Sequence, residues 1–206
     1  ENKKIRGDFE GAYKSSEVIW SQQYNMEAPH FAYIRGLILE RKLELGNMLS
    51  VLDIGCGYGA FVNNLNKYKV GKVVGYDISK TAIEIGKKKF GEKLDTRVGS
   101  LDEISVYKSK FDFVLLLGVL WFLLDDLPGA IKKIKKLMCP QSEFILTLNI
   151  PKDPIGKEII KDYNGLVEII SDSFEIIDVF YWYQEETIKL NEFSEYKTDM
   201  LIRCKL

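Results

Sequence analysis

A short apolar segment that breaks into three glycines constrains this chain more than any other feature of its sequence. The run from Leu49 to Ile54 is too short and too uniformly apolar for an amphipathic helix, which favours a strand buried on both faces of a parallel sheet. Gly55, Gly57 and Gly59 follow at alternate positions, and the next apolar residues recur at helical spacing. The sequence therefore predicts a strand, a tight turn and a helix. Such a turn lets a ligand lie against the backbone, and the N–H groups of the following helix favour negative charge there.

A second signal supports a nucleotide-like ligand at this turn. The segment from Lys72 to Asp77 is another apolar strand pattern, and it ends in an acid about 20 residues beyond the glycines. A carboxylate at the tip of this strand is suited to accept hydrogen bonds from both hydroxyls of a ribose. A glycine-rich turn alone is also typical of an ordinary strand-to-helix connection. The matched spacing of the two signals favours the ligand site.

The segments Asp53–Gly59 and Gly75–Ser79 together resemble the class I S-adenosylmethionine-dependent methyltransferases. In that family an acid and one further residue precede glycines at every second position, whereas dinucleotide-binding oxidoreductases use G-x-G-x-x-G. The resemblance implies S-adenosylmethionine as cofactor, S-adenosylhomocysteine as product, and no metal. It assigns cofactor binding here to Asp53, Gly55, Gly57, Gly59, Asp77 and Ile78. An NAD(P)-dependent oxidoreductase and a non-catalytic S-adenosylmethionine-binding subunit remain alternatives.

Two later segments extend the resemblance. Ser100, Leu101 and Asp102 follow a short strand pattern and resemble the family's adenine loop, where a polar side chain and a backbone N–H contact the base. Ser100 and Leu101 align best with those roles, and Asp102 is the competing acceptor; a plain turn is the alternative. The apolar strand pattern Phe111–Leu117 runs into Gly118, where family members use the backbone to bind the methionine amino group.

The acceptor is expected beside this fourth strand, because ligands of open parallel sheets lie beyond the carboxyl ends of the strands. Trp121 follows the strand, and Trp20 and Tyr181 are the other candidates for substrate binding. The segment Leu117–Leu120 lacks the motifs of DNA base, protein arginine and metal-dependent catechol-type methyltransferases. Asp125 and its neighbour Asp126 are more typical of a helix cap than of a cation site.

Charge and composition narrow the partners. The formal net charge is −1, with acidic and basic residues mixed along the chain, which gives no footprint for a nucleic-acid backbone. A small-molecule acceptor is expected, such as a sugar or a phosphorylated metabolite of a biosynthetic pathway, with the protein a monomer or a homodimer. The three cysteines are far apart, and no apolar run is long enough for a membrane helix or resembles a signal peptide. We therefore expect a cytoplasmic protein without a membrane partner.

Residues 1–28 are interpreted as a lid. Tyr13, Trp20 and Tyr24 either pack this segment onto the domain or close over the cofactor and substrate, as N-terminal extensions do in the resembled family. A short helix is expected over 15–23. Candidate general bases are Tyr13, Tyr24, Asp125 and His30, the only histidine, which is either a residue of a helix's first turn or a base tuned near neutral pH.

The length of 206 residues fits a single methyltransferase domain over 1–206, with the lid and a Rossmann-like core over 29–206. The patterns predict helices over 29–45, over 79–89 and, interrupted near Asn164-Gly165, over 155–171. A fifth strand is expected over 143–150, and a last one over 198–205 follows too short a segment for a helical crossover, so it is expected antiparallel. The fold class is α/β: a seven-stranded mostly parallel sheet with helices on both faces and an antiparallel last strand, a three-layer α/β/α sandwich.

Overall fold

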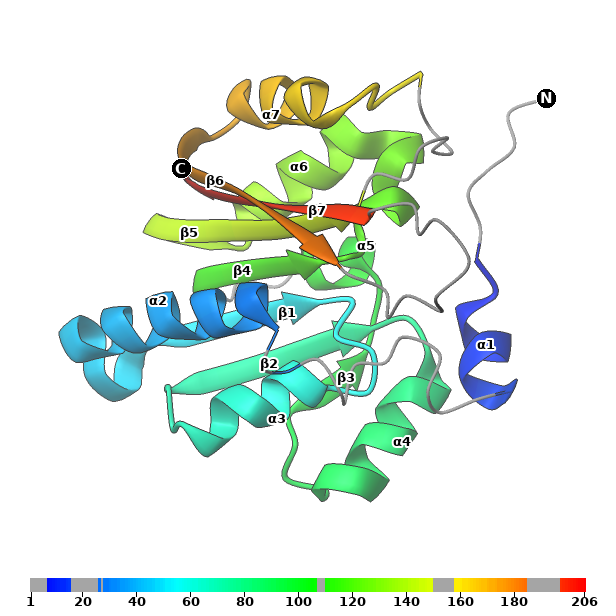
Figure 1. The fold of residues 1–206 in the computed structure, drawn as a ribbon. Helices are drawn as coiled ribbons and strands as arrows, with labels where there is room; N and C mark the ends of the chain where they lie inside the picture. Colours follow the sequence, from blue (N-terminus) through cyan, green and yellow to red (C-terminus); the bar gives the residue numbers. More distant parts are fainter. Residues whose placement is uncertain (1–6, 16–25, 27, 107–109, 150–157, 185–196) are drawn as a thin grey trace, which may run out of the picture.

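The computed structural model describes residues 7–15, 26, 28–106, 110–149, 158–184 and 197–206. Its centre is one seven-stranded sheet in the order β3-β2-β1-β4-β5-β7-β6 (Figure 1). The strands are β1 Ser50–Ile54, β2 Lys72–Asp77, β3 Thr96–Val98, β4 Phe111–Leu117, β5 Met138–Asn149, β6 Glu175–Gln184 and β7 Lys197–Lys205. β7 runs antiparallel to both of its neighbours, β5 and β6, and the pairs among β3, β2, β1, β4 and β5 are parallel. The predicted fold class is confirmed.

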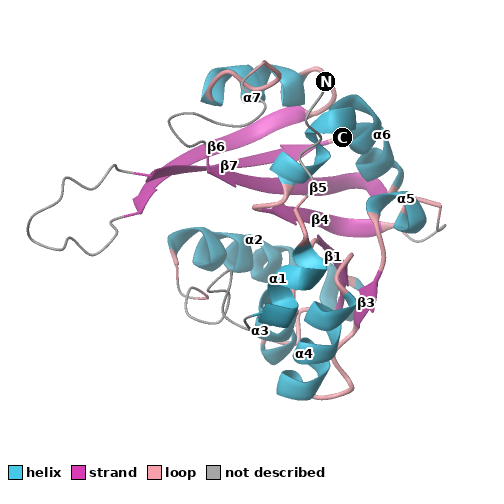
Figure 2. Ribbon diagram, turned by 90° about the vertical axis from the view of Figure 1, so that its right-hand side faces the viewer, coloured by secondary structure: helices cyan, strands magenta, loops and turns pink. Residues whose placement is uncertain are grey.

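Helices cover both faces of the sheet (Figure 2). The helices are α1 Phe9–Ser15, α2 Pro29–Leu45, α3 Ala60–Lys67, α4 Lys80–Phe90, α5 Leu101–Ile104, α6 Leu127–Lys136 and α7 Tyr163–Ser171, with 3₁₀ turns η1 Gly46–Met48 and η2 Leu120–Asp126. Ile34 of α2 and Phe61 of α3 share one apolar core with Val51 of β1. Ile134 of α6 and Leu166 of α7 share the core on the opposite face. Each face of the apolar strands is thus removed from water, as a parallel sheet requires.

Side-chain caps begin several of these helices where the sequence predicts them. The Ser79 hydroxyl accepts from the N–H of Ala82 at 3.1 Å and begins α4. The carboxylate of Asp126 accepts from the N–H of Gly129 at 3.1 Å and begins α6, so the expected capping role of this acid is confirmed. Both caps satisfy N–H groups that have no partner within the helix.

The helix expected over 155–171 was placed wrongly. α7 begins at Tyr163, and Ile160 lies buried outside it. The carboxylate of Asp162 accepts from the N–H of Gly165 at 2.9 Å. Because Asp162 caps the helix, the pair Asn164-Gly165 lies in its first turn. The pair therefore does not interrupt the helix. Residues 150–157 lie outside the described residues.

Two further boundaries differ from the sequence prediction. β5 begins at Met138, earlier than expected, because Met138 pairs with Phe111 before an irregularity in the ladder. In the N-terminal segment, the described helix is α1, which ends at Ser15, and the helix expected over 15–23 lies outside the described residues apart from Ser15 itself.

No helix of the described chain is both long and apolar enough to cross a lipid bilayer.

Candidate active site

The three glycines after β1 form a turn in which each has positive φ: +73° at Gly55, +57° at Gly57 and +79° at Gly59. Residues with a Cβ atom rarely adopt this conformation, so glycine at these positions lets the backbone form the turn without strain. The N–H groups of Gly55 and Cys56 both donate to the carbonyl of Tyr76, at 2.7 and 3.0 Å. The turn is therefore fixed to the end of β2, which brings the tips of the first two strands together.

Asp77 at the tip of β2 connects this turn to the next one. One carboxylate oxygen accepts from the N–H of Gly57 and the other from the N–H of Ser79, both at 2.8 Å. Burial raises the pKa of Asp77, and these backbone hydrogen bonds oppose that rise. An ionised carboxylate has about four acceptor positions, so two bonds leave capacity for the hydroxyls of a ligand.

A cavity of about 850 Å³ opens beyond the carboxyl ends of β1, β2 and β4. This volume lies within the range of roughly 300–1,000 Å³ typical of ligand sites. The predicted residues that line it are Tyr13, His30, Asp53, Gly55, Asp77, Ile78, Ser100, Leu101, Asp102, Gly118, Trp121 and Asp125. The structure thus brings together in one cavity the segments from which a nucleoside site was predicted. The individual roles of these residues stay predictions.

Other predicted residues do not line the cavity. Gly57 and Gly59 shape the turn and are not among the residues that line the cavity, and their cofactor-binding role stays a prediction. Tyr181 was also expected at the substrate, but it lies on β6, at the edge of the sheet beyond β7, and packs against Tyr163 with ring centroids 5.5 Å apart. Trp20 and Tyr24 lie outside the described residues.

The expected adenine loop is held by its own hydrogen bonds. The hydroxyl of Ser100 accepts from the Glu103 N–H at 3.3 Å and the Glu103 carboxylate accepts from the Ser100 N–H at 2.7 Å, which is a capping box at the start of α5. The hydroxyl also donates to the Glu103 carboxylate at 2.9 Å. These bonds compete with the role predicted for the Ser100 side chain in contacting a base. Asp102 pairs with Lys133 of α6 at 2.5 Å, and Lys133 also lies 3.7 Å from Asp126.

Lys133 of α6 lines the cavity but was not among the residues predicted from the sequence. The side chain lines the cavity and joins α6 to the loop after β3. No local signal distinguishes it from the neighbouring lysines, because the contact depends on how two helices pack. Thr147 of β5 and Asp199 of β7 also line the cavity and were not predicted.

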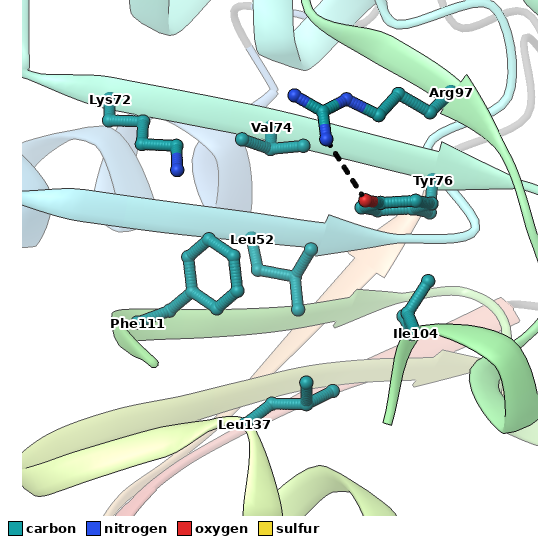
Figure 3. A pocket seen from close by; sticks show the side chains of 8 residues that line it. All are labelled: Leu52, Lys72, Val74, Tyr76, Arg97, Ile104, Phe111 and Leu137. Carbon is teal, nitrogen blue, oxygen red and sulfur yellow. Dashed lines mark hydrogen bonds between the residues drawn. The ribbon is translucent and has the colours of Figure 1, made fainter. Parts of the chain in front are cut away.

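A second, smaller cavity of about 220 Å³ shares none of its lining residues with the first. Its walls include Leu52 and Val74, on the face of the sheet that α6 covers (Figure 3). Arg97 lies at its side and donates to the Tyr76 hydroxyl at 3.4 Å and to Asp95 at 2.8 Å. Because the guanidinium already has an acid partner, this cavity offers no clear anion site, and we assign it no function.

Comparison with protein families gives a match over residues 52–146, to a family described as a methyltransferase domain. This range runs from β1 into β5 and includes the glycine turn, Asp77 and the exit of β4. The chain carries a methyltransferase domain. Together with the fold, this match supports the predicted resemblance to the class I S-adenosylmethionine-dependent methyltransferases, with S-adenosylmethionine as the cofactor.

Among curated proteins, an uncharacterised protein of Rickettsia prowazekii is 31% identical over 105 residues, which cover 48% of this chain. The match spans only 42% of that relative's length.

Solved methyltransferases share the fold of the whole described domain. A TehB-like S-adenosylmethionine-dependent methyltransferase of Corynebacterium glutamicum has a TM-score of 0.65 at 18% identity, covering 95% of this chain and 98% of its own. The N-methyltransferase NodS of Bradyrhizobium japonicum, in complex with S-adenosylhomocysteine, has a TM-score of 0.64 at 15% identity, and the match covers 97% of this chain and 98% of NodS. The magnesium protoporphyrin IX methyltransferase of Synechocystis, with S-adenosylmethionine, has a TM-score of 0.59 at 18% identity over 98% and 86%.

Asp53, the first acid of the methyltransferase motif, is 3% exposed and lines the cavity. Burial raises the pKa of this carboxyl to about 7, with a further contribution from the charge of Asp77. In the ligand-free domain, folded Asp53 thus holds a proton between its unfolded pKa of about 4 and pH 7. The stability that this proton confers is lost as the pH rises through that window.

A pH dependence of cofactor binding follows from Asp53. A sulfonium cation in the cavity favours the ionised carboxylate, so binding of S-adenosylmethionine should release a proton below pH 7. The sulfur of S-adenosylhomocysteine carries no charge, so its binding serves as the reference. We expect the ratio of the affinity for S-adenosylmethionine to that for S-adenosylhomocysteine to rise between pH 6 and pH 8, by at most about tenfold per pH unit. Calorimetric titrations at both pH values measure this ratio. If the ratio rises with pH by the same factor in Asp53→Asn as in the wild type, the pH dependence does not come from Asp53.

His30 lies in the first turn of α2 and lines the cavity. Burial lowers the pKa of His30 to about 4. This direction does not favour a base tuned near neutral pH in the ligand-free protein, because desolvation disfavours the imidazolium, and the catalytic role of His30 stays a prediction. His30 is a neutral imidazole at pH 7 and is suited to hydrogen bonding rather than to strong general-base catalysis.

Helix α1 lies across one side of the cavity of the methyltransferase domain. Phe9 and Tyr13 of α1 line the cavity, and the Phe9 ring contacts Phe122 of η2 edge to face, with centroids 4.5 Å apart. α1 is also attached to the start of α4, where the Glu10 carboxylate accepts from the hydroxyls of Ser79 and Thr81 at 2.8 and 2.6 Å. It also accepts from the Thr81 N–H at 3.2 Å, at the start of α4.

These bonds lower the pKa of Glu10 to about 2, so the contact is ionised at all ordinary pH values. Replacing Glu10 with glutamine should weaken the attachment of α1 and accelerate the dissociation of S-adenosylhomocysteine several-fold, because the negative charge at the start of α4 is lost. Stopped-flow displacement measures the dissociation rate. Glu84→Gln is the matched control, since Glu84 pairs with Lys80 on the exposed side of α4. Equal rates in both variants would show that Glu10 does not hold α1 over the cofactor.

Proposed function

We propose that this chain transfers a methyl group from S-adenosylmethionine to an oxygen or nitrogen atom of a small-molecule acceptor. The observation that carries the proposal is the cavity in which Gly55, Asp77 and Gly118 lie together at the tips of β1, β2 and β4. The donor supplies a methyl carbon made electrophilic by a sulfonium. Asp77 is proposed to accept from the ribose hydroxyls, and the backbone of Gly118 to bind the amino group of the methionine half.

The remaining walls favour transfer by positioning and exclusion of water. Phe31, Leu117, Val119 and Trp121 give the cavity apolar sides, and α1 supplies a further aromatic wall. Such walls hold a nucleophile at attack distance and keep competing water away from the methyl carbon. A neutral amine needs no general base for this reaction, whereas an alcohol does.

The acceptor itself stays a prediction, as do the single domain, the proposed monomer or homodimer and the cytoplasmic location. The sequence favours a sugar or a phosphorylated metabolite. The solved neighbours include an N-methyltransferase and a magnesium protoporphyrin IX methyltransferase, so the shared fold alone does not select an acceptor. The charges that line the cavity bear on this choice.

Two measurements test the proposed function. Thermal shift with S-adenosylhomocysteine and with NAD separates a methyltransferase from an oxidoreductase, and stabilisation by NAD alone would overturn the proposal. A screen of cellular metabolite pools with S-adenosylmethionine then seeks products heavier by one methyl group. Cofactor binding without any methylated product would favour the remaining alternative, a non-catalytic binding subunit.

A further inference from the structure

Aromatic side chains flank the exit of β4 from both faces of the sheet. Phe31, in the first turn of α2, lines the cavity and packs against the core that α2 and α3 share with the sheet. Trp121 of η2 also lines the cavity, but it packs, like Val119, against the core on the opposite face. The cavity beyond the tip of β4 therefore lies between one aromatic side chain from each face of the sheet.

Neighbouring rings support this part of the cavity. The Phe31 ring contacts the ring of Phe61, a buried residue of α3, with centroids 4.9 Å apart. Beside Trp121, the Phe122 ring meets Phe9 of α1 edge to face, with centroids 4.5 Å apart. Both sides are thus built from packed aromatic groups, which suits a ligand that enters a preformed site.

Aliphatic side chains extend these aromatic sides. Met26, Leu117 and Leu148 all line the cavity. A sugar bound here would place several hydroxyls against apolar walls, and each buried hydroxyl without a hydrogen-bond partner costs free energy. An aromatic ring buries both of its faces against such walls at no similar cost. The walls therefore favour a flat apolar body over a sugar.

The lysine that lines the cavity is already paired with acids. Among the lining residues that the structure describes, Lys133 is the one lysine or arginine. It forms ion pairs with Asp102 at 2.5 Å and with Asp126 at 3.7 Å, and the hydrogen bond to Asp102 raises its pKa. A phosphorylated acceptor would have to compete with these two carboxylates for Lys133, which disfavours it.

We propose that the acceptor has a flat aromatic body, held between Phe31 and Trp121, and that these two residues determine the specificity for it. This inference rests on the proposed function and narrows its acceptor. The oxygen or nitrogen that receives the methyl group lies at the edge of the ring, towards the exit of β4. Contacts between aromatic rings contribute beyond the area that they bury, so two such contacts distinguish an aromatic ring from a saturated one.

Three probes test this selection: 2-naphthol, 2-decalol, which has the same carbon skeleton without aromatic rings, and glucose 6-phosphate. Each is titrated calorimetrically into the full chain saturated with S-adenosylhomocysteine, which fills the nucleoside site so that a flat probe cannot occupy it. We expect 2-naphthol to bind at least about fivefold more tightly than 2-decalol, and at least about tenfold more tightly than glucose 6-phosphate.

Two variants assign the preference to the two rings. Phe31→Leu and Trp121→Leu each keep an apolar side chain and remove the ring. Each should lower the affinity for 2-naphthol at least about threefold, while the affinities for 2-decalol and S-adenosylhomocysteine stay within about twofold. Phe180→Leu is the matched control and should behave as the wild type, because the Phe180 ring is 45% exposed on β6, stacks on Tyr33 at 5.2 Å and does not line the cavity.

The comparison of the three probes in the wild-type chain decides the question even if a variant fails to fold. Equal binding of the three, tighter binding of 2-decalol or glucose 6-phosphate, no binding of 2-naphthol, or an unchanged 2-naphthol affinity in both folded variants would each overturn the inference. Failure of the wild-type chain to bind S-adenosylhomocysteine would instead contradict the proposed function. Methylation of sugars or phosphorylated metabolites alone would support the proposed function and overturn the aromatic acceptor.

Discussion

Replacing Asp77 with alanine is expected to weaken S-adenosylmethionine binding by about 2–3 kcal/mol, or roughly 30- to 150-fold. The carboxylate is buried, and its loss removes the acceptors that we propose for the two ribose hydroxyls, in a site where water replaces them poorly. It also removes the bonds to the N–H groups of Gly57 and Ser79, which fix the glycine turn to the start of α4. Calorimetric titration of S-adenosylmethionine into both proteins measures the difference.

Asp112 offers a matched control for this substitution. Its carboxylate also accepts two hydrogen bonds, from the N–H and the hydroxyl of Ser50 at 2.8 and 2.7 Å, but at the amino end of β1. Asp112→Ala should lower stability and leave the cofactor affinity unchanged. If Asp77→Ala binds S-adenosylmethionine as tightly as the wild type, the ribose contact of Asp77 is wrong.

Replacing Gly55 with alanine should reduce both stability and cofactor binding. A Cβ atom at this position would lie 2.4 Å from a methyl carbon of Val119, and φ is +73°. The left-handed conformation costs an L-residue about 1–2 kcal/mol, and the displaced β-branched Val119 side chain adds to that cost. Because Val119 lines the cavity, its displacement also narrows the site, so we expect at least a tenfold loss of affinity, about 1.4 kcal/mol.

Gly91→Ala separates backbone strain from the steric effect. Gly91 has φ of +97° at the end of α4, and a Cβ atom there would meet no atom within 4 Å. This control should lose stability through strain alone, with cofactor affinity preserved. Melting temperatures and calorimetric affinities of both variants give the comparison. A Gly55→Ala protein that binds S-adenosylmethionine like the wild type would show that the glycine turn does not border the donor.

The parts of the fold that sequence reasoning predicted depend on local signals. β1 and β4 are largely apolar runs that each end at a glycine, and Ser79 and Asp126 are caps that act within one helical turn. The antiparallel β7 was predictable because the segment before it is too short for a helical crossover. The error in α7 has the same origin, since an apolar pattern located the helix while the carboxylate of Asp162 determined where it begins.

The residues of the site that were missed depend on contacts between distant segments. Asp199 belongs to no motif, and its place in the cavity follows only from the pairing of β7 with β5. Lys133 is one of several lysines on α6, and packing against the loop of Asp102 distinguishes it. For Ser100, the sequence contained the relevant signal in Glu103 three residues later, which forms the capping box that occupies the hydroxyl.

The position of a bound donor tests the central claim most directly. A crystal structure of the full chain with S-adenosylhomocysteine should show both ribose hydroxyls within hydrogen-bonding distance of Asp77. The sulfur atom should lie beside Gly118, on the side of β4 that faces β5. An adenosyl group bound away from the tips of β1 and β2, or a carboxylate of Asp77 directed away from the ribose, would contradict the account.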